Sequence, residues 1–136
     1  MRRAILLTGF NNWGKTTHII NLFSNENRQR QRFHFGHHYT IQGVHASFTV
    51  ETHSNDDFGQ KQYIEALENR IKESDDRGKN LFGAFCPTRW QRSPRGKTND
   101  CLEILGHPPL SRYDEVYLFY LRFKWDHHAE LNINEI

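Results

Sequence analysis

The sequence has few cysteines, so disulfide bonds and cysteine-bound metals are not expected to stabilise the fold. Its 136 residues include only two cysteines, Cys86 and Cys101, which form neither a disulfide framework nor a metal-binding motif. No apolar run is long enough to span a membrane, and the residues after Met1 lack the long apolar region and cleavage site of a signal peptide. We therefore expect a single domain over residues 1–136, located in the cytoplasm.

A large excess of one charge is also absent. The net charge is +2, which is too small to indicate nucleic-acid binding, and the basic segment 28–32 (RQRQR) is typical of a solvated loop. Aromatic residues, in contrast, are plentiful, with ten Phe, five Tyr and three Trp. Because aromatic side chains bury much surface per residue, even this short chain can form an adequate core.

Apolar runs that alternate with helical patterns predict an α/β fold. The expected strands cover 4–8, 33–41, 44–52, 80–86 and 115–123, the expected helices cover 15–23, 60–74 and 100–105, and the expected loops include 24–32, 53–59 and 87–99. The short turn at Gln42-Gly43 predicts that the second and third strands form an antiparallel hairpin. The remaining strands should be parallel, which gives a three-layer sandwich with a mainly parallel five-stranded sheet.

Ligands of such sheets bind at the carboxyl ends of the strands, so the loops after residues 8, 52 and 86 are the candidate site. The first of them, Gly9-Phe10-Asn11-Asn12-Trp13-Gly14-Lys15-Thr16, matches the pattern Gly-x-x-x-x-Gly-Lys-Ser/Thr at every fixed position. Its glycines allow the backbone N–H groups to surround a phosphate, and Lys15 supplies a positive charge. The hydroxyl of Thr16 is a candidate ligand for Mg²⁺.

This segment resembles the phosphate-binding loop of the P-loop NTPase superfamily. The resemblance is specific over residues 4–23 and implies that the chain binds ATP or GTP together with Mg²⁺. The residues expected to bind the nucleotide are Gly9, Asn11, Asn12, Trp13, Gly14, Lys15, Thr16 and Thr17. Trp13 either packs under the loop or faces the nucleotide.

The resemblance also implies a second acidic residue that binds Mg²⁺ at the end of a neighbouring strand. The loop after residue 52 offers Asp56, which we favour, and Asp57. One of Asn55, Asp56 and Asp57 is expected to cap the following helix instead. Glu51 is closer to the usual position of this acid, but it lies on the polar side of an alternating strand.

The segment from Asp56 to Gln60 also matches the Asp-x-x-Gly-Gln pattern of the second switch of GTP-binding regulatory proteins. There the glutamine orients the attacking water, so Gln60 becomes a candidate catalytic residue. The guanine-recognition pattern Asn-Lys-x-Asp is missing after the fourth strand, where Cys86-Pro87-Thr88-Arg89 stands instead. A GTPase-like switch is therefore a minor alternative.

The basic loop after residue 86 suggests phosphoryl transfer as another alternative. Segment 87–98 carries Arg89, Arg92, Arg95 and Lys97. In small P-loop kinases a mobile lid at this position brings arginines to the transferred phosphate, so Arg89 is a further catalytic candidate.

The histidines are a weak candidate for a metal site. His34, His37 and His38 lie in the second expected strand, and His45 and His53 lie in or beside the third. We interpret them as surface or partly packed residues rather than as ligands.

Three functions follow from these patterns: a Mg²⁺-dependent NTP hydrolase, most simply an ATPase; a small kinase with 87–98 as its lid; and a non-catalytic nucleotide sensor. Lys15, Asp56, Asp57, Gln60 and Arg89 are the candidate catalytic residues, and Thr16 and Asp56 are the candidate metal ligands. Because no final helix is evident, the last strand is expected to need cover from a second copy or a protein partner. Neither a membrane nor a nucleic acid is indicated as a partner.

Overall fold

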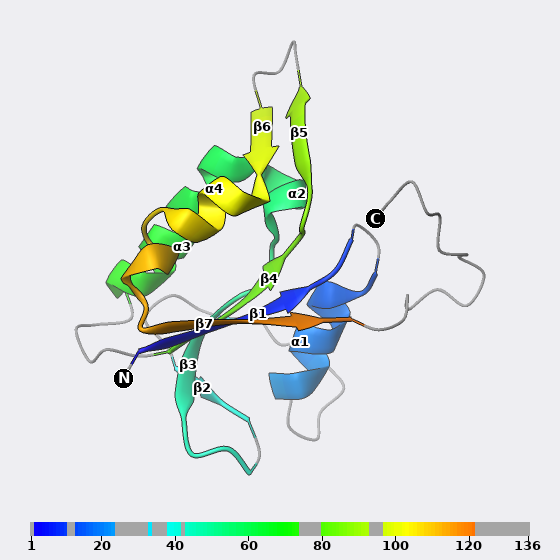
Figure 1. Ribbon diagram of the computed structural model, residues 1–136. Helices are drawn as coiled ribbons and strands as arrows, with labels where there is room; N and C mark the ends of the chain where they lie inside the picture. Colours follow the sequence, from blue (N-terminus) through cyan, green and yellow to red (C-terminus); the bar gives the residue numbers. More distant parts are fainter. Residues whose placement is uncertain are drawn as a thin grey trace.

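The computed structural model describes residues 2–10, 13–23, 33, 38–41, 43–73, 80–92 and 97–121. Its main sheet has five strands in the order β2-β3-β4-β1-β7 (Figure 1). These strands are β1 (Arg3–Thr8), β2 (Tyr39–Thr40), β3 (Ser47–Glu51), β4 (Asn80–Phe85) and β7 (Glu115–Tyr120). All neighbouring strands are parallel except β2 and β3, which form an antiparallel pair. The predicted mainly parallel sheet with one antiparallel hairpin is confirmed.

Helix α1 (Lys15–Phe23) covers one face of this sheet. Its buried side chains Ile19 and Phe23 pack against Phe48 of β3 and Phe82 of β4. The ring of Phe23 meets that of Phe82 edge to face at 5.2 Å between centroids. This is a favourable arrangement for aromatic rings and adds to the gain from burying them.

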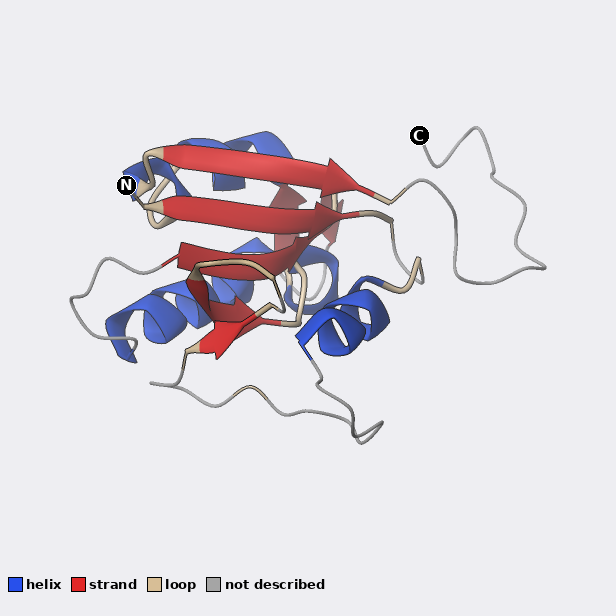
Figure 2. Cartoon of the chain, turned by 90° about the horizontal axis from the view of Figure 1, so that it is seen from below, coloured by secondary structure: helices blue, strands red, loops and turns tan. Residues whose placement is uncertain are grey.

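The other face is covered by α3 (Gln60–Glu73), α4 (Cys101–Gly106) and the short 3-10 helix η1 (Leu110–Arg112), as Figures 1 and 2 show. Tyr63 and Leu67 of α3 are fully buried against β1 and β4, and each such side chain contributes about 2 kcal/mol through apolar burial. The hydroxyl of Tyr63 donates a hydrogen bond to the carbonyl of Ala84 at 2.7 Å. Helices therefore lie on both faces, as predicted for an α/β sandwich.

Several expected boundaries are wrong. The predicted loop 53–59 contains a helical turn, α2 (Asn55–Phe58), and the predicted strand 44–52 is a strand only from Ser47 to Glu51. Of the predicted strand 33–41, only Tyr39–Thr40 is a strand among the residues that the structure describes. The predicted helix 60–74 matches α3, apart from residue 74, which lies outside the described part of the chain. The predicted strand 115–123 matches β7 up to Tyr120; Leu121 is no longer part of the strand, and residues 122–123 lie outside the described part.

The largest correction concerns segment 87–99, which was expected to be a loop. It contains β5 (Arg89–Arg92) and β6 (Lys97–Asp100), which pair as an antiparallel hairpin apart from the main sheet. The helix after it, α4, begins at Cys101, one residue later than predicted, because the carboxylate of Asp100 accepts hydrogen bonds from the backbone N–H groups of Leu102 and Glu103. This is the usual N-cap arrangement of an aspartate.

The last strand, β7, lies at one edge of the sheet and carries exposed aromatic side chains at Tyr117, Phe119 and Tyr120. Cover by a second copy or a partner protein stays a prediction. Within the described ranges, no helix has both the length and the apolar character needed to cross a lipid bilayer.

Candidate functional site

The loop Gly9–Thr16 connects the end of β1 to the start of α1. The N–H of Gly9 donates to the carbonyl of Phe85, which ties the beginning of the loop to the end of β4. Gly14 has φ of 85°, a left-handed conformation that a side chain disfavours, and Lys15 begins the helix. Asn11 and Asn12 lie outside the described residues, so their predicted contacts are not addressed by the structure.

Trp13 is a buried component of this loop. Its side chain is 8% exposed, and its ring lies edge-on to that of Phe10 at 5.3 Å between centroids. A Cβ added at Gly9 would lie 3.4 Å from the Cβ of Trp13 and 3.2 Å from Leu121. Of the two alternatives for Trp13, the structure shows packing within the loop. Contact between Trp13 and a nucleotide stays a prediction.

The side chain of Lys15 folds back across the loop. Its Nζ donates to the carbonyl of Gly9 at 2.7 Å and to that of Phe10 at 2.9 Å. The same Nζ lies 3.9 Å from Oδ2 of Asp56, and Lys15 is only 7% exposed. A buried ammonium group is costly unless it is paired and hydrogen-bonded, and these three oxygens satisfy that requirement.

Asp56 is the acid that meets the loop. It reaches Lys15 from α2, which follows β3, although β4 separates β3 from β1 in the sheet. The strand that precedes Asp56 is therefore not a direct neighbour of β1 in the sheet, yet the acid favoured from the sequence is the one beside Lys15. Its side chain is 10% exposed, and its Oδ1 is buried with no hydrogen-bond partner. Burial raises the pKa of this carboxyl group, and the nearby charge of Lys15 only partly offsets that effect.

The two other acids of this region have different partners. Oδ2 of Asp57 accepts a hydrogen bond from the backbone N–H of Ser54 at 3.1 Å, so Asp57 caps the start of α2, whereas the sequence predicted that a residue of this segment would cap the helix that starts at Gln60. Glu51 is buried rather than exposed on a polar side, and its carboxylate lies 3.6 Å from Nε of Arg70 and 3.5 Å from Nδ1 of His53. The alternation in this strand did not reveal that α3 covers the Glu51 side as well.

The two threonines after Lys15 differ in their surroundings. The hydroxyl of Thr16 donates to the carbonyl of Thr52 at 3.0 Å, which joins the start of α1 to the end of β3. Thr17 is exposed on α1. The loops after β1, β3 and β4 therefore meet at the carboxyl edge of the sheet, as predicted.

The side chains of Gln60 and Arg89 contact Asp100 rather than the loop Gly9–Thr16. Oε1 of Gln60 accepts a hydrogen bond from the backbone N–H of Asp100 at 2.9 Å. The guanidinium group of Arg89 lies 3.1 Å from the carboxylate of Asp100, and its side chain is 65% exposed. These contacts hold the β5–β6 hairpin, so the structure gives no support to the predicted roles of Gln60 in orienting water or of Arg89 in a lid.

Asn55 is a residue whose importance the sequence did not indicate. Its fully buried amide accepts from the N–H of Cys86 at 2.7 Å and donates to the carbonyl of Cys86 at 2.9 Å. It also donates to Oδ1 of Asn99 at 2.9 Å, and the amide of Asn99 in turn donates to Thr88. The turn that carries Asp56 is thereby fixed to the end of β4 and to β6.

The described residues provide no separate metal centre. They contain no group of three or more His, Cys, Asp or Glu side chains that could hold a metal ion; His34 and His37 lie outside the described ranges. Cys86 is buried, and burial raises the pKa of its thiol. A buried thiol of this kind behaves as an inert apolar group rather than a nucleophile.

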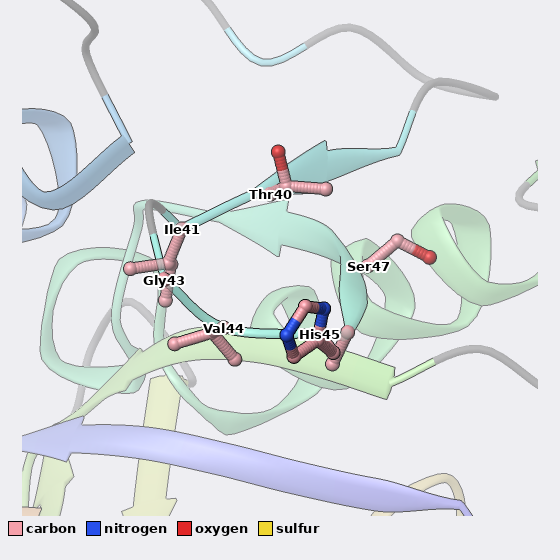
Figure 3. A pocket seen from close by; sticks show the side chains of 7 residues that line it. Thr40, Ile41, Gly43, Val44, His45 and Ser47 are labelled. Carbon is pink, nitrogen blue, oxygen red and sulfur yellow. The ribbon is translucent and has the colours of Figure 1, made fainter.

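An open hollow of about 560 Å³ lies at the turn between β2 and β3 (Figure 3). It is lined by residues of β2, of the turn and of the approach to β3, among them Thr40, Val44, His45 and Ser47. This turn precedes β3 and so lies at the amino edge of the sheet, opposite the loop Gly9–Thr16. The described residues that line the hollow include no Lys, Arg, Asp or Glu side chain, and none of the site residues predicted from the sequence lies among them.

Comparisons with known proteins add no further constraint. The sequence matches no known family model, and neither the curated proteins nor the solved structures contain a significant match.

Proposed function

We propose that this chain binds a nucleoside triphosphate with Mg²⁺ at the Gly9–Thr16 loop and hydrolyses it. The observation that carries the proposal is the buried pair of Lys15 and Asp56, whose Nζ and Oδ2 lie 3.9 Å apart at the end of a strand-loop-helix unit. A positive charge for phosphate oxygens and an oxygen ligand for a divalent cation are the two groups that phosphoryl chemistry needs close together.

The side chains at this position suit Mg²⁺. Asp56 supplies a buried carboxylate oxygen, Oδ1, that has no hydrogen-bond partner, and Thr16 supplies a hydroxyl oxygen. Mg²⁺ prefers oxygen ligands and commonly takes only one or two from the protein, the rest being phosphate and water. When bound, it would neutralise charge on the phosphate oxygens.

Asp56 is the best candidate for the Mg²⁺ ligand, because the two neighbouring acids have other partners. Asp57 is engaged with the backbone of Ser54, and Glu51 is engaged with Arg70 and His53. Asp56 alone among the three lies against Lys15. In the proposed reaction Lys15 would move from the loop carbonyls to the terminal phosphates. Water would attack the terminal phosphorus as its bond to the nucleoside diphosphate breaks, which releases inorganic phosphate and the nucleoside diphosphate.

Hydrolysis is preferred over transfer to an acceptor because the proposed lid has no observation in its favour. Its described residues form the β5–β6 hairpin, and Arg89 pairs with Asp100 within that hairpin. ATP is the first nucleotide to test, since the guanine-recognition pattern is missing after β4.

Release of inorganic phosphate from ATP and GTP, with and without Mg²⁺, tests the proposal. We expect Mg²⁺-dependent release by the wild type and its loss in Asp56→Asn and Lys15→Ala. Formation of a nucleoside diphosphate and a phosphorylated acceptor, only when a hydroxyl-bearing acceptor is added and without release of inorganic phosphate, would instead indicate a kinase. Mg²⁺-dependent binding without turnover would indicate a sensor.

A further inference from the structure

The backbone of α2 decides where the carboxylate of Asp56 lies. Among the described residues, Oδ1 of Asp56 has no hydrogen-bond partner, and its Oδ2 lies 3.9 Å from Nζ of Lys15, which is too long for a hydrogen bond. Because α2 has only four residues, it is too short to be stable as an isolated helix. Contacts with other parts of the chain must therefore hold the turn that presents Asp56 to Lys15.

The side chain of Asn55, the residue before Asp56, makes such contacts. Its Oδ1 accepts from the N–H of Cys86, and its Nδ2 donates to the carbonyl of Cys86 and to Oδ1 of Asn99. Asn55 is fully buried, and a reversed amide would place acceptor against acceptor and donor against donor. The three contacts therefore allow one orientation of this amide.

Asn99 comes from β6, beside α2 at the base of the β5–β6 hairpin (Figure 1). Its side chain is 2% exposed. Its Nδ2 donates to the carbonyl of Thr88 at 2.9 Å and to the hydroxyl of Thr88 at 3.1 Å, which leaves Oδ1 to accept from Asn55. Thr88 thus fixes the direction of the Asn99 amide, and Asn99 helps to fix that of Asn55.

We propose that Asn99 is a positioning residue for Asp56, the candidate Mg²⁺ ligand, and that it acts through Asn55. This inference rests on the proposed function, since it concerns the carboxylate of that site. Residues that orient a metal ligand without touching the metal commonly change metal affinity when they are replaced. Substitution of Asn99 should therefore weaken the Mg²⁺-dependent part of ATP binding more than the binding of ATP itself.

The first measurement is the affinity for ATP in excess Mg²⁺ and in EDTA, by titration calorimetry, for the wild type and Asn99→Ala. We expect the ratio of the two affinities to fall at least about fivefold in Asn99→Ala, while the affinity in EDTA stays within about twofold. A general loss of stability lowers both affinities alike and would leave this ratio unchanged.

Asn80→Ala is the matched control. The amide of Asn80 also accepts a backbone hydrogen bond, from Arg3, but it does so at the opposite end of β4. This variant should keep the affinity ratio within about twofold of the wild type.

Two substitutions at Thr88 retain the test if Asn99→Ala does not fold. Thr88→Val removes the hydroxyl that accepts from Asn99 and keeps the backbone carbonyl, so it should lower the ratio by about threefold. Thr88→Ser retains a hydroxyl and should keep the ratio of the wild type.

The second measurement needs no nucleotide. The N–H groups of Cys86 and Gly59 donate to Oδ1 and to the carbonyl of Asn55, so their hydrogen exchange reports whether the turn is held. Both should exchange at least about tenfold faster in Asn99→Ala. The N–H of Leu121, which donates to the carbonyl of Thr8, lies outside this network and should exchange at an unchanged rate.

Mg²⁺-dependent binding by the wild type with an unchanged ratio in Asn99→Ala would overturn the positioning role and leave the proposed function intact. An equal fall of the ratio in Asn80→Ala would also overturn it, because the effect would then not be specific to the network. Absence of Mg²⁺-dependent binding by the wild type would mean that the proposed function has failed, and the role of Asn99 toward Mg²⁺ with it. Hydrogen exchange then decides whether Asn99 holds the turn: unchanged rates at Cys86 and Gly59 would overturn that part too.

Discussion

Nζ of Lys15 lies 3.9 Å from Oδ2 of Asp56, and both side chains are at least nine-tenths buried. The two residues come from different loops, one after β1 and one after β3. Their contact brings a cation and an acid together at the carboxyl edge of the sheet, where the hydroxyl of Thr16 also lies against the end of β3. Removing one partner from a buried pair leaves an uncompensated charge, so substitutions at this pair have distinct and measurable effects.

The first prediction concerns the charge of Asp56. Burial raises the pKa of this carboxyl group above its ordinary value of 3.8, so the folded state binds a proton more readily than the unfolded state. The wild type should therefore lose stability as the pH rises from about 4 through the raised pKa. Asp56→Asn should remove this pH-dependent loss, because an amide does not titrate over this range, while Lys15 keeps its two carbonyl partners. Thermal unfolding across this pH range measures both effects; identical curves for the two proteins would contradict the account.

The second prediction separates the two adjacent aspartates. Asp57→Asn should keep the affinity for ATP and Mg²⁺ within about threefold, since an asparagine oxygen can still accept from Ser54, whereas Asp56→Asn should lower it at least tenfold. Titration calorimetry with and without Mg²⁺ provides the comparison. A larger effect at Asp57 than at Asp56 would exchange their roles.

The third prediction tests the buried amide of Asn55. Asn55→Ala should lower the free energy of unfolding by about 3 kcal/mol, because the N–H and carbonyl of Cys86 and the amide of Asn99 each lose a partner. Asn21→Ala, at an exposed position on α1, is the matched control and should cost less than about 0.5 kcal/mol. Urea unfolding gives both values, and similar values would mean that the Asn55 network adds little stability.

The fourth prediction uses two glycines. Gly14→Ala should destabilise the loop by about 1–2 kcal/mol, because Gly14 has φ of 85° and a side chain disfavours that conformation. Gly106→Ala, at the end of α4, should be neutral or slightly stabilising, since a Cβ there meets no atom within 4 Å. Thermal unfolding of the two variants checks this; an unchanged Tm for Gly14→Ala would argue against a strained loop.

The sequence predicted well those elements whose conformation depends on residues within or directly beside the element. Helix α1 has the predicted bounds because Gly14 permits the turn before it and its apolar residues recur at helical spacing, as at Ile19 and Phe23. The same holds for β1, whose apolar residues continue on both sides of the strand, as expected when both faces are covered.

The errors come from elements that depend on distant partners. Strands β5 and β6 consist almost entirely of polar residues and show no apolar alternation, and their support comes from the side chains of Asn55 and Gln60. The Asp-x-x-Gly-Gln pattern predicted that Gln60 orients water, but in the structure Gln60 accepts a hydrogen bond from the backbone of Asp100. This contact depends on a residue far along the chain, so the local pattern could not indicate it. Asp56 rather than Asp57 lies beside Lys15, and only the fold shows that Asp57 has a capping role. Which of the two binds Mg²⁺ stays a prediction.

Titration calorimetry of Lys15→Ala with ATP and Mg²⁺ tests the central claim most directly. Lys61→Ala, an exposed lysine on α3, is the matched control for loss of one positive charge. The account predicts that wild type and Lys61→Ala bind equally, while Lys15→Ala binds at least tenfold more weakly. Absence of binding by the wild type, or equal affinity in Lys15→Ala, would contradict a nucleotide site at this loop.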